Sequence, residues 1–204
     1  MSRRRFFLAT VVLAALVCAA SATGAGRPRP LQAGDWRTWW GQATIKNGAY
    51  TLESQTPVWP GETHSALLTS TSSWGDHAFS FTTTTLEQLR IGSPPNPWEV
   101  AWAMFRFRDL ENYYYFILKP NGYELGKKQG SDEQIFLVTG TSPQLALGKR
   151  NRIQIQAQGE RIRVFVDGAR IIDFTDPNPL RSGAVGLYEE DARVRFESVT
   201  VTQL

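Results

Sequence analysis

The chain has 204 residues, of which 42% are hydrophobic, so it is long enough for one domain with a substantial core. Its formal charge of +3 comes from 22 Lys and Arg against 19 Asp and Glu, and three of the arginines lie among the first five residues. Without those three, basic and acidic side chains balance at 19 each, which argues against nucleic acid or an anionic membrane surface as the partner.

Residues 1–22 have the pattern of a removable export signal. Three arginines precede an apolar run of 13 residues, and the small-residue cleavage sequence Ala20-Ser21-Ala22 follows. The run is short for a bilayer span, so we expect a secreted or extracytoplasmic protein of bacterial type, without a membrane span after signal removal. The order Ser-Arg-Arg-x-Phe-Phe resembles a twin-arginine export signal, and an ordinary secretory signal is the alternative.

The single cysteine, Cys18, lies inside this signal, so the mature chain forms no internal disulfide. Residues 23–34 are rich in glycine and proline and predict a flexible leader. A single domain is expected over residues 35–204, and it has to be stabilised by its core.

The first elements of that domain are short strands. A hairpin is expected over residues 43–53, because Asn47-Gly48 suits the positive φ angles of a type I′ turn. Strands are expected over residues 66–70 and 77–85, where β-branched and aromatic residues are frequent.

A loop over residues 90–97 leads into the strongest structural signal, three antiparallel strands in succession over residues 96–128. The polar residues 109–112 suit the first turn of this meander, and Asn121-Gly122 suits a tight second turn. Counting outward from the turns gives the expected cross-strand neighbours: Arg108 with Tyr113, Arg106 with Tyr115, Trp102 with Lys119, and Lys119 with Glu124.

The meander is expected to have two unlike faces, because side chains alternate across a strand with a period of two. One face is apolar and is expected to be core; it carries Ala101, Ala103, Phe105, Phe107, Tyr114, Phe116, Leu118 and Leu125. The other face carries Trp102, Arg106, Tyr115, Lys119 and Glu124. Charged side chains and aromatic rings converge on this second face, which makes it the candidate for function.

Short alternating strands continue to the end of the chain. They are expected over residues 134–139, 152–157, 161–166, 169–174, 183–188 and 193–201. No segment shows a convincing period of 3.6 residues. The chain is therefore predicted to be an all-β, two-sheet antiparallel β-sandwich.

Several segments resemble concanavalin A-like jelly rolls. They are RIRVFVDGARII (161–172), SGAVGLY (182–188), VRFESVTV (194–201) and DLENYYYF (109–116). The chain is most similar to the laminin-G-like domains and to the 3-keto-disaccharide hydrolase domain family, over about residues 35–203. The resemblance implies the fold but not one activity, because this fold hosts lectins, glycosidases, lyases and protein-binding modules.

The sequence lacks the known catalytic and metal-binding patterns. A retaining glycosidase needs two carboxylates about 5 Å apart, and the E-x-D-x-x-E strand of family 16 glycosidases is missing. Glu189-Glu190-Asp191 is contiguous, so adjacent side chains point to opposite faces, and we interpret the cluster as a solvated turn. The separate His64 and His77 do not predict zinc. No cofactor is expected, although the resemblance allows Ca²⁺, for which this cluster lacks a recognisable ligand spacing.

The second face of the meander suits a carbohydrate, because aromatic rings stack on sugars and charged groups make directional hydrogen bonds to hydroxyls. The expected ligand-binding residues are Trp102, Arg106, Tyr115, Lys119 and Glu124 on the sheet, Trp98 at its entry, and Arg90 in the preceding loop. The alternative is an ordinary solvated face with a Lys119–Glu124 ion pair. A tryptophan among charges on an exposed face favours a binding site, and a covering loop, such as residues 90–97, is the alternative explanation.

Three functions follow as hypotheses. The first is a secreted carbohydrate-binding or carbohydrate-processing domain that uses the concave sheet face. The second is a glycoside hydrolase similar to the 3-keto-disaccharide hydrolases, with Glu124 and Glu99 as candidate catalytic carboxylates; strand counting places these two on opposite faces, so at most one acts there. The third is a non-catalytic, laminin-G-like interaction module. The missing glycosidase pattern favours sugar recognition over hydrolysis.

Overall fold

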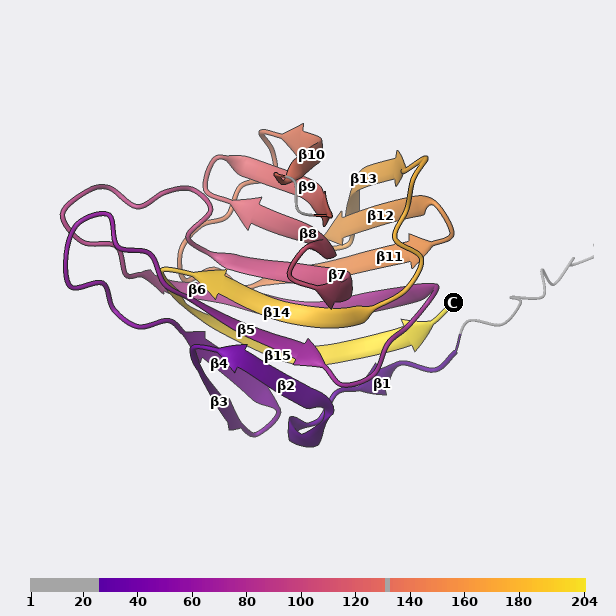
Figure 1. Ribbon diagram of the computed structural model, residues 1–204, viewed down its shortest axis with the longest axis horizontal. Helices are drawn as coiled ribbons and strands as arrows, with labels where there is room; N and C mark the ends of the chain where they lie inside the picture. Colours follow the sequence, from indigo (N-terminus) through magenta and orange to yellow (C-terminus); the bar gives the residue numbers. More distant parts are fainter. Residues whose placement is uncertain (1–25, 131–132) are drawn as a thin grey trace, which may run out of the picture.

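The computed structural model describes residues 26–130 and 133–204, and the predicted signal peptide over residues 1–22 lies outside them. Within the described residues, two antiparallel sheets of eight and seven strands pack face to face (Figure 1). The predicted all-β sandwich is confirmed. A helix long and apolar enough to cross a membrane was not found in this part of the chain.

The eight-stranded sheet has the order β13-β12-β11-β6-β15-β4-β3, with β1 paired to β15. Its strands are β1 (Arg29–Pro30), β3 (Gln42–Lys46), β4 (Ala49–Glu53), β6 (His77–Gln88), β11 (Asn151–Gln158), β12 (Arg161–Val166), β13 (Ala169–Thr175) and β15 (Ala192–Gln203). Asn47 and Gly48, between β3 and β4, have φ angles of 52° and 75°, which confirms the predicted hairpin turn.

The seven-stranded sheet has the order β10-β9-β8-β7-β14-β5-β2. Its strands are β2 (Trp36–Trp40), β5 (Ser65–Ser70), β7 (Ala101–Asp109), β8 (Asn112–Lys119), β9 (Gly122–Gln129), β10 (Ile135–Gly140) and β14 (Ala184–Glu190). A short 3-10 helix, η1 (Ala33–Asp35), precedes β2. The predicted meander is β7-β8-β9, next to β14 in the middle of this sheet.

The core lies between the two sheets, where alternate side chains of the long strands meet. Phe105 of β7 and Tyr114 of β8 are fully buried, and their rings stack with centroids 5.1 Å apart and planes 13° apart. Within the other sheet, the Phe81 ring centroid lies 5.0 Å from that of Phe79 and 5.6 Å from that of Phe196. Burial of apolar area stabilises a fold by roughly 25 cal/mol per Å², so this aromatic layer is a major source of stability.

The chain joins the sandwich earlier than the sequence predicts. Arg29 and Pro30 pair with β15, and the backbone N–H of Leu31 donates to Val199 O at 3.0 Å. Leu31 is buried, and its carbonyl accepts the Tyr50 hydroxyl at 2.6 Å. The flexible leader predicted over residues 23–34 is therefore wrong for its described part, which lies on the sheet. Prolines suit this edge position because they lack an N–H to pair.

The register of the meander differs from the predicted one by two residues. Trp102 lies opposite Ile117, Ile117 opposite Glu124, and Lys119 opposite Gly122. The second turn is formed by Pro120 and Asn121, and Gly122 begins β9, where a side chain would overlap the carbonyl of Gly140. A shift of two residues keeps the same side chains on the same face, so the predicted faces hold for this part of the meander.

A bulge in β7 changes the faces at the other end of the meander. Phe105 pairs with Tyr114 and Asp109 with Asn112, so three residues of β7 lie opposite one of β8. At the start of the bulge Arg106 has a φ angle of 46°, and it passes so close to Gly183 that a side chain there would overlap the Arg106 backbone. Phe107 is buried, but it packs against Trp39 and Tyr113 beside the hollow that Trp102 lines on the outer side of the sheet. The prediction that it faces the core between the sheets is therefore wrong.

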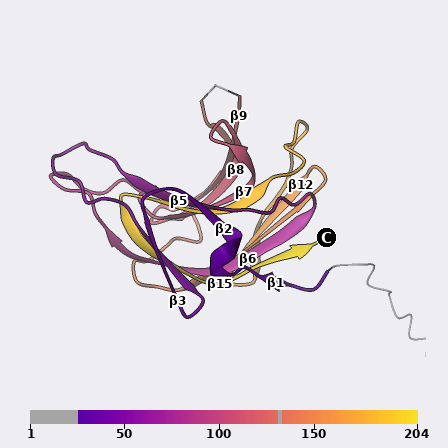
Figure 2. The same cartoon turned by 60° about the horizontal axis from the view of Figure 1, so that its bottom comes forward.

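Two long loops, residues 54–64 and 89–100, leave the sandwich on the same side. Figure 1 and Figure 2 both show them extending together beyond the ends of the strands. Pro60 of the first loop packs over Gly92 of the second, where a side chain would overlap the proline ring. The second loop carries Trp98 back to the start of β7.

Candidate functional site

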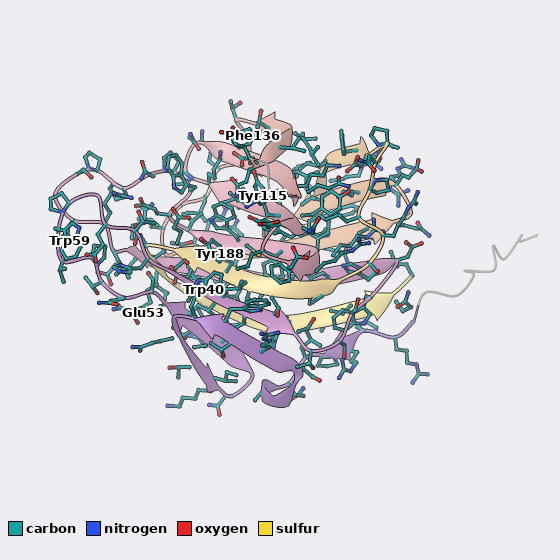
Figure 3. All side chains as sticks on the ribbon, in the orientation of Figure 1. Trp40, Glu53, Trp59, Tyr115, Phe136 and Tyr188 are labelled. Atoms are coloured by element: carbon teal, nitrogen blue, oxygen red, sulfur yellow. The ribbon has the colours of Figure 1, made fainter. Side chains whose placement is uncertain are left out.

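The outer face of the seven-stranded sheet is hollowed by a groove of about 460 Å³. Its lining consists of Trp98, Trp102, Ile117, Lys119, Glu124, Gln134, Phe136 and Glu190. A second hollow of about 230 Å³ adjoins it and shares Trp102, Gln134 and Glu190. We call the first hollow the groove. Figure 3 shows Tyr115, Tyr188 and Phe136 on the sheet that bears it.

Aromatic rings form the floor and one wall of the groove. Trp102 is the floor: it is 6% exposed, and its ring centroid lies 5.1 Å from that of Tyr115 and 5.2 Å from that of Tyr188. Its indole N–H donates to Trp98 O at 2.7 Å, which fixes the ring. Trp98 is 42% exposed and Phe136 64% exposed. The groove therefore offers free aromatic surface above a floor that is held in place.

Lys119, Glu124 and Tyr115 form a hydrogen-bonded polar cluster at the groove. Lys119 Nζ lies 2.7 Å from Glu124 Oε2, and the Tyr115 hydroxyl donates to Glu124 Oε1 at 2.7 Å. Tyr115 is fully buried and lies across Gly126, where a side chain would overlap its ring. Burial, and secondly the hydrogen bond to Glu124, raise the pKa of Tyr115, so its hydroxyl stays a donor.

Glu190, at the end of β14, is the second carboxylate of the groove. The Trp98 indole N–H donates to Glu190 Oε1 at 3.0 Å, and the Tyr188 hydroxyl donates to Oε2 at 3.1 Å. Burial raises the pKa of Glu190 above its ordinary value, and the charges of Asp191 and Glu99 raise it further against the two hydrogen bonds. A carboxylate in this environment is a better proton acceptor than an exposed one.

Four of the predicted site residues line the groove together: Trp98, Trp102, Lys119 and Glu124. Tyr115 lies beneath them and holds Glu124, so its role is support. The predicted Lys119–Glu124 ion pair is confirmed at 2.7 Å. It faces the groove beside the aromatic rings, so the ion pair and the aromatic surface belong to one site.

Arg106 is not on this face, which corrects the prediction. The bulge turns it inward, where it is fully buried and donates to Gly159 O and Leu180 O, each at 2.8 Å. Its guanidinium also lies 3.2 Å from Asp76 Oδ1. Arg106 thus joins loops at one end of the sandwich, and its buried charge is matched by backbone carbonyls and one carboxylate.

Arg90 and Glu99 also lie away from the groove lining. Glu99 is fully buried and forms an ion pair with Arg90, and Asn96 donates to the same carboxylate at 2.7 Å. Arg90 Nη2 lies 3.4 Å from Asp191 Oδ2 and from Thr63 Oγ1. These predicted site residues therefore tie the two long loops to the end of β14 and position Trp98 only indirectly.

The prediction missed Glu190 and Tyr188, since the sequence Glu189-Glu190-Asp191 was interpreted as a solvated turn. That interpretation is wrong: β14 continues to Glu190, while Glu189 and Asp191 are fully buried. Asp191 Oδ1 accepts the backbone N–H of His64 at 2.7 Å. The period-two rule contained the needed signal, because Tyr188 and Glu190 are two residues apart and so share a face.

The structure also bears on metal binding. In residues 26–130 and 133–204, no group of three or more His, Cys, Asp or Glu side chains is arranged to hold a metal ion.

A further cavity of about 460 Å³ lies between β1, the β3–β4 turn and β15, but the described residues that line it include no aromatic side chain. Aromatic and charged side chains therefore meet in the groove rather than in that cavity.

Comparison with known proteins gives a family and a fold. The model of the 3-keto-alpha-glucoside-1,2-lyase-like domain matches residues 31–202. Among solved structures, the carbohydrate-binding module CBM66 of Bacillus subtilis superposes with a TM-score of 0.66 at 19% identity, covering 82% of this chain and 94% of that one. The β-glucanase of Bacillus licheniformis gives 0.58 at 10% identity, covering 89% and 99%.

A third similar structure, a Bacillus subtilis protein of unknown function with a galectin-like fold, has a TM-score of 0.65 at 14% identity and covers 88% of this chain and 96% of its own. No curated protein matches the sequence. At these identities the structural similarities establish only the jelly-roll fold, which the resemblance noted in the sequence also implies. The family model covers nearly the whole described chain.

Proposed function

The chain belongs to the family of 3-keto-alpha-glucoside-1,2-lyase-like domains, and from this premise we propose that it binds a carbohydrate in the groove of the seven-stranded sheet. The proposal rests on one observation: a single hollow is lined by both aromatic and charged side chains. They are Trp98, Trp102 and Phe136, and Lys119, Glu124 and Glu190. A volume of about 460 Å³ falls within the range of small-ligand sites, roughly 300–1,000 Å³.

The chemistry of the groove suits a sugar with free hydroxyl groups. Trp98 presents an exposed face on which the C–H side of a sugar ring can stack. Glu190 and Glu124 retain acceptor lone pairs beyond the bonds they make, and Lys119 can donate to a hydroxyl. Lys119 and Glu124 neutralise each other, so the charge of Glu190 makes the groove lining net negative. A negative lining favours neutral sugars over uronic acids.

The descriptions of the similar structures support this proposal. One is described as a carbohydrate-binding module, one as having a galectin-like fold and one as a β-glucanase. The predicted export signal would place the protein outside the cytoplasm, and we propose that it binds its glycan there.

The test is a glycan array followed by titration calorimetry of the glycans that bind. Trp98→Ala is expected to weaken binding on the order of tenfold or more, because the stacking face is lost. Ile45→Ala is the matched control, since Ile45 is 38% exposed on β3 and lies outside the groove. Equal affinity of wild type and Trp98→Ala, or no binding to any glycan, would contradict the proposal.

The second candidate function is cleavage of a 3-keto glucoside, which the position of Glu190 favours. A carbonyl at carbon 3 makes the hydrogen at carbon 2 acidic. Removal of that proton by a carboxylate lets the bond between carbon 1 and the leaving oxygen break, giving a double bond between carbons 1 and 2, and the leaving oxygen takes up a proton. Glu190 has the raised pKa that a general base needs, and its two hydrogen bonds come from the neutral donors Trp98 and Tyr188. Glu124 is instead paired with the charged Lys119.

A nitrophenyl 3-keto-α-glucoside tests this second function by release of nitrophenol. Glu190→Gln is expected to slow release about 100-fold or more, since the amide cannot accept the proton. Glu124→Gln serves as the comparison and is expected to change release less. Unchanged release by Glu190→Gln would remove Glu190 as the base, whereas no release by wild type would leave sugar binding as the function.

A further inference from the structure

A second aromatic surface lies outside the groove, on the loop of residues 54–64. Trp59 is 60% exposed and the adjacent Val58 is 65% exposed. Figure 3 shows Trp59 at the far end of this loop, on the side where both long loops extend. Exposure of so much apolar surface on neighbouring residues is unfavourable in water, and such patches commonly mark sites where something binds.

The loop holds Trp59 in a defined position. The backbone N–H of Val58 donates to Glu62 Oε2 at 2.6 Å, and that of Glu62 donates to Trp59 O at 3.3 Å. Gly61 supplies the φ angle of +86° that closes this turn. His64 Nε2 lies 3.3 Å from Glu62 Oε1. An aromatic ring on a turn closed in this way loses less conformational entropy on binding than one on a free loop.

The Trp59 loop is tied to the loop that carries Trp98. Pro60 packs over Gly92, and Arg90 Nη2 lies 3.4 Å from Thr63 Oγ1. Arg90 in turn pairs with Glu99, next to Trp98. The root of the Trp59 loop is also close to the groove, because Ser65 pairs with Glu190 at the start of β5. Exposed tryptophans therefore stand on two loops that contact each other, one at the groove and one beyond it.

We infer that Trp59 forms a distal binding site for a sugar ring of the same glycan that occupies the groove, so that the protein takes an extended oligosaccharide or polysaccharide. This inference rests on the proposed function of the groove. Residues 54–64 contain no Lys or Arg, so the loop lacks the positive charge that attracts an anionic membrane or nucleic acid. The flat, exposed indole suits a neutral sugar face.

The experiment measures how affinity depends on glycan length. Wild type, Trp59→Ala and Trp59→Phe are titrated with malto-, cello- and laminari-oligosaccharides, each from the disaccharide to the hexasaccharide. In wild type the affinity is expected to rise with length. Trp59→Ala is expected to bind disaccharides as wild type does and to lose on the order of tenfold in affinity for the longest oligomers that bind. Trp59→Phe keeps an aromatic face and is expected to recover most of that loss.

Two controls separate the distal site from the groove. Trp98→Ala is expected to weaken binding at every length, and Ile45→Ala at none. If Trp59→Ala binds long oligomers as tightly as wild type while Trp98→Ala does not, the groove function stands and the distal site is overturned. If wild type binds none of these glucans and no glycan on the array, the inference fails together with the proposed function. Association of wild type with phosphatidylcholine vesicles that is lost in Trp59→Ala would also overturn it, in favour of a lipid surface.

Discussion

Arg106 illustrates how one side chain can be placed by backbone geometry rather than by its chemistry. Its residue type and its position in the period-two pattern put it among Trp102, Lys119 and Glu124. The φ angle of 46° instead turns it into the sandwich, where its guanidinium is bonded to Gly159 O and Leu180 O. A buried guanidinium is tolerated where acceptors surround it, and here backbone carbonyls of two loops and Asp76 accept from its Nη atoms, while Nε has no partner among the described residues.

Replacement of Arg106 tests that structural role. Arg106→Ala is expected to lower the free energy of unfolding by about 3 kcal/mol, because the buried Leu180 carbonyl and the partly buried Gly159 carbonyl lose their donor and a cavity remains. Arg108→Ala, two residues away at an exposed position, is expected to change it by less than about 0.5 kcal/mol. Denaturant unfolding measures both. An Arg106→Ala protein as stable as wild type, with impaired glycan binding, would return Arg106 to the ligand site.

At the scale of elements, the end of β14 carries neighbouring residues of which one belongs to the groove and another affects the stability of the fold. Glu189, Glu190 and Asp191 are consecutive, with Glu190 facing the groove and Glu189 fully buried on the other side. Glu189 Oε2 accepts the backbone N–H of Ala192 at 2.9 Å, while Oε1 has no partner among the described residues. Burial raises the pKa of Glu189 to about 8, against the hydrogen bond from Ala192.

This shift gives a prediction for the pH dependence of stability. The folded protein keeps a proton on Glu189 that the unfolded chain releases above its ordinary pKa of 4.5. Glu189 therefore costs stability increasingly as the pH rises from about 4.5 to about 8, and little below that range. Glu189→Gln, which needs no proton, is expected to melt several degrees above wild type at about pH 8 and near wild type at about pH 4.

Thermal melting across that pH range measures the effect, and Glu160→Gln provides the control. Glu160 is about half exposed in a pair with Arg181, so its replacement is expected to shift melting little at any pH. A Glu189→Gln protein whose melting temperature follows wild type in parallel across the whole range would show that Glu189 is ionised in the fold.

The elements themselves could largely be predicted from the sequence, because turn residues and alternation act locally. The Asn47-Gly48 turn and the strand β12 (Arg161–Val166) appear where their patterns put them. Strand β2 was missed, since Trp36, Trp39 and Trp40 do not alternate with polar residues in the usual way. The bulge in β7 was also missed: it depends on the close approach of Gly183, which is distant in the sequence.

At the scale of the whole molecule, the groove depends on contacts that no local pattern contains. Trp98 comes from a long loop, Lys119 and Glu124 from the β8–β9 hairpin, Phe136 from β10 and Glu190 from β14. The hairpin residues were predicted because they are close in sequence. Glu190 was missed because its sequence was interpreted as a turn and because strand order, rather than sequence distance, brings β14 beside β7. The buried pairs of Arg90 with Glu99 and Asp191 hold this assembly together.

The central claim, that a glycan occupies the groove, is tested most directly by nuclear magnetic resonance of the indole N–H groups during titration with a glycan that binds on the array. The N–H groups of Trp98 and Trp102 lie in the groove, bonded to Glu190 and to Trp98 O, while Trp36 and Trp74 lie outside its lining. We predict that the signals of Trp98 and Trp102 shift with the glycan and those of Trp36 and Trp74 stay. Shifts confined to Trp36 or Trp74 would place the glycan elsewhere and contradict the account.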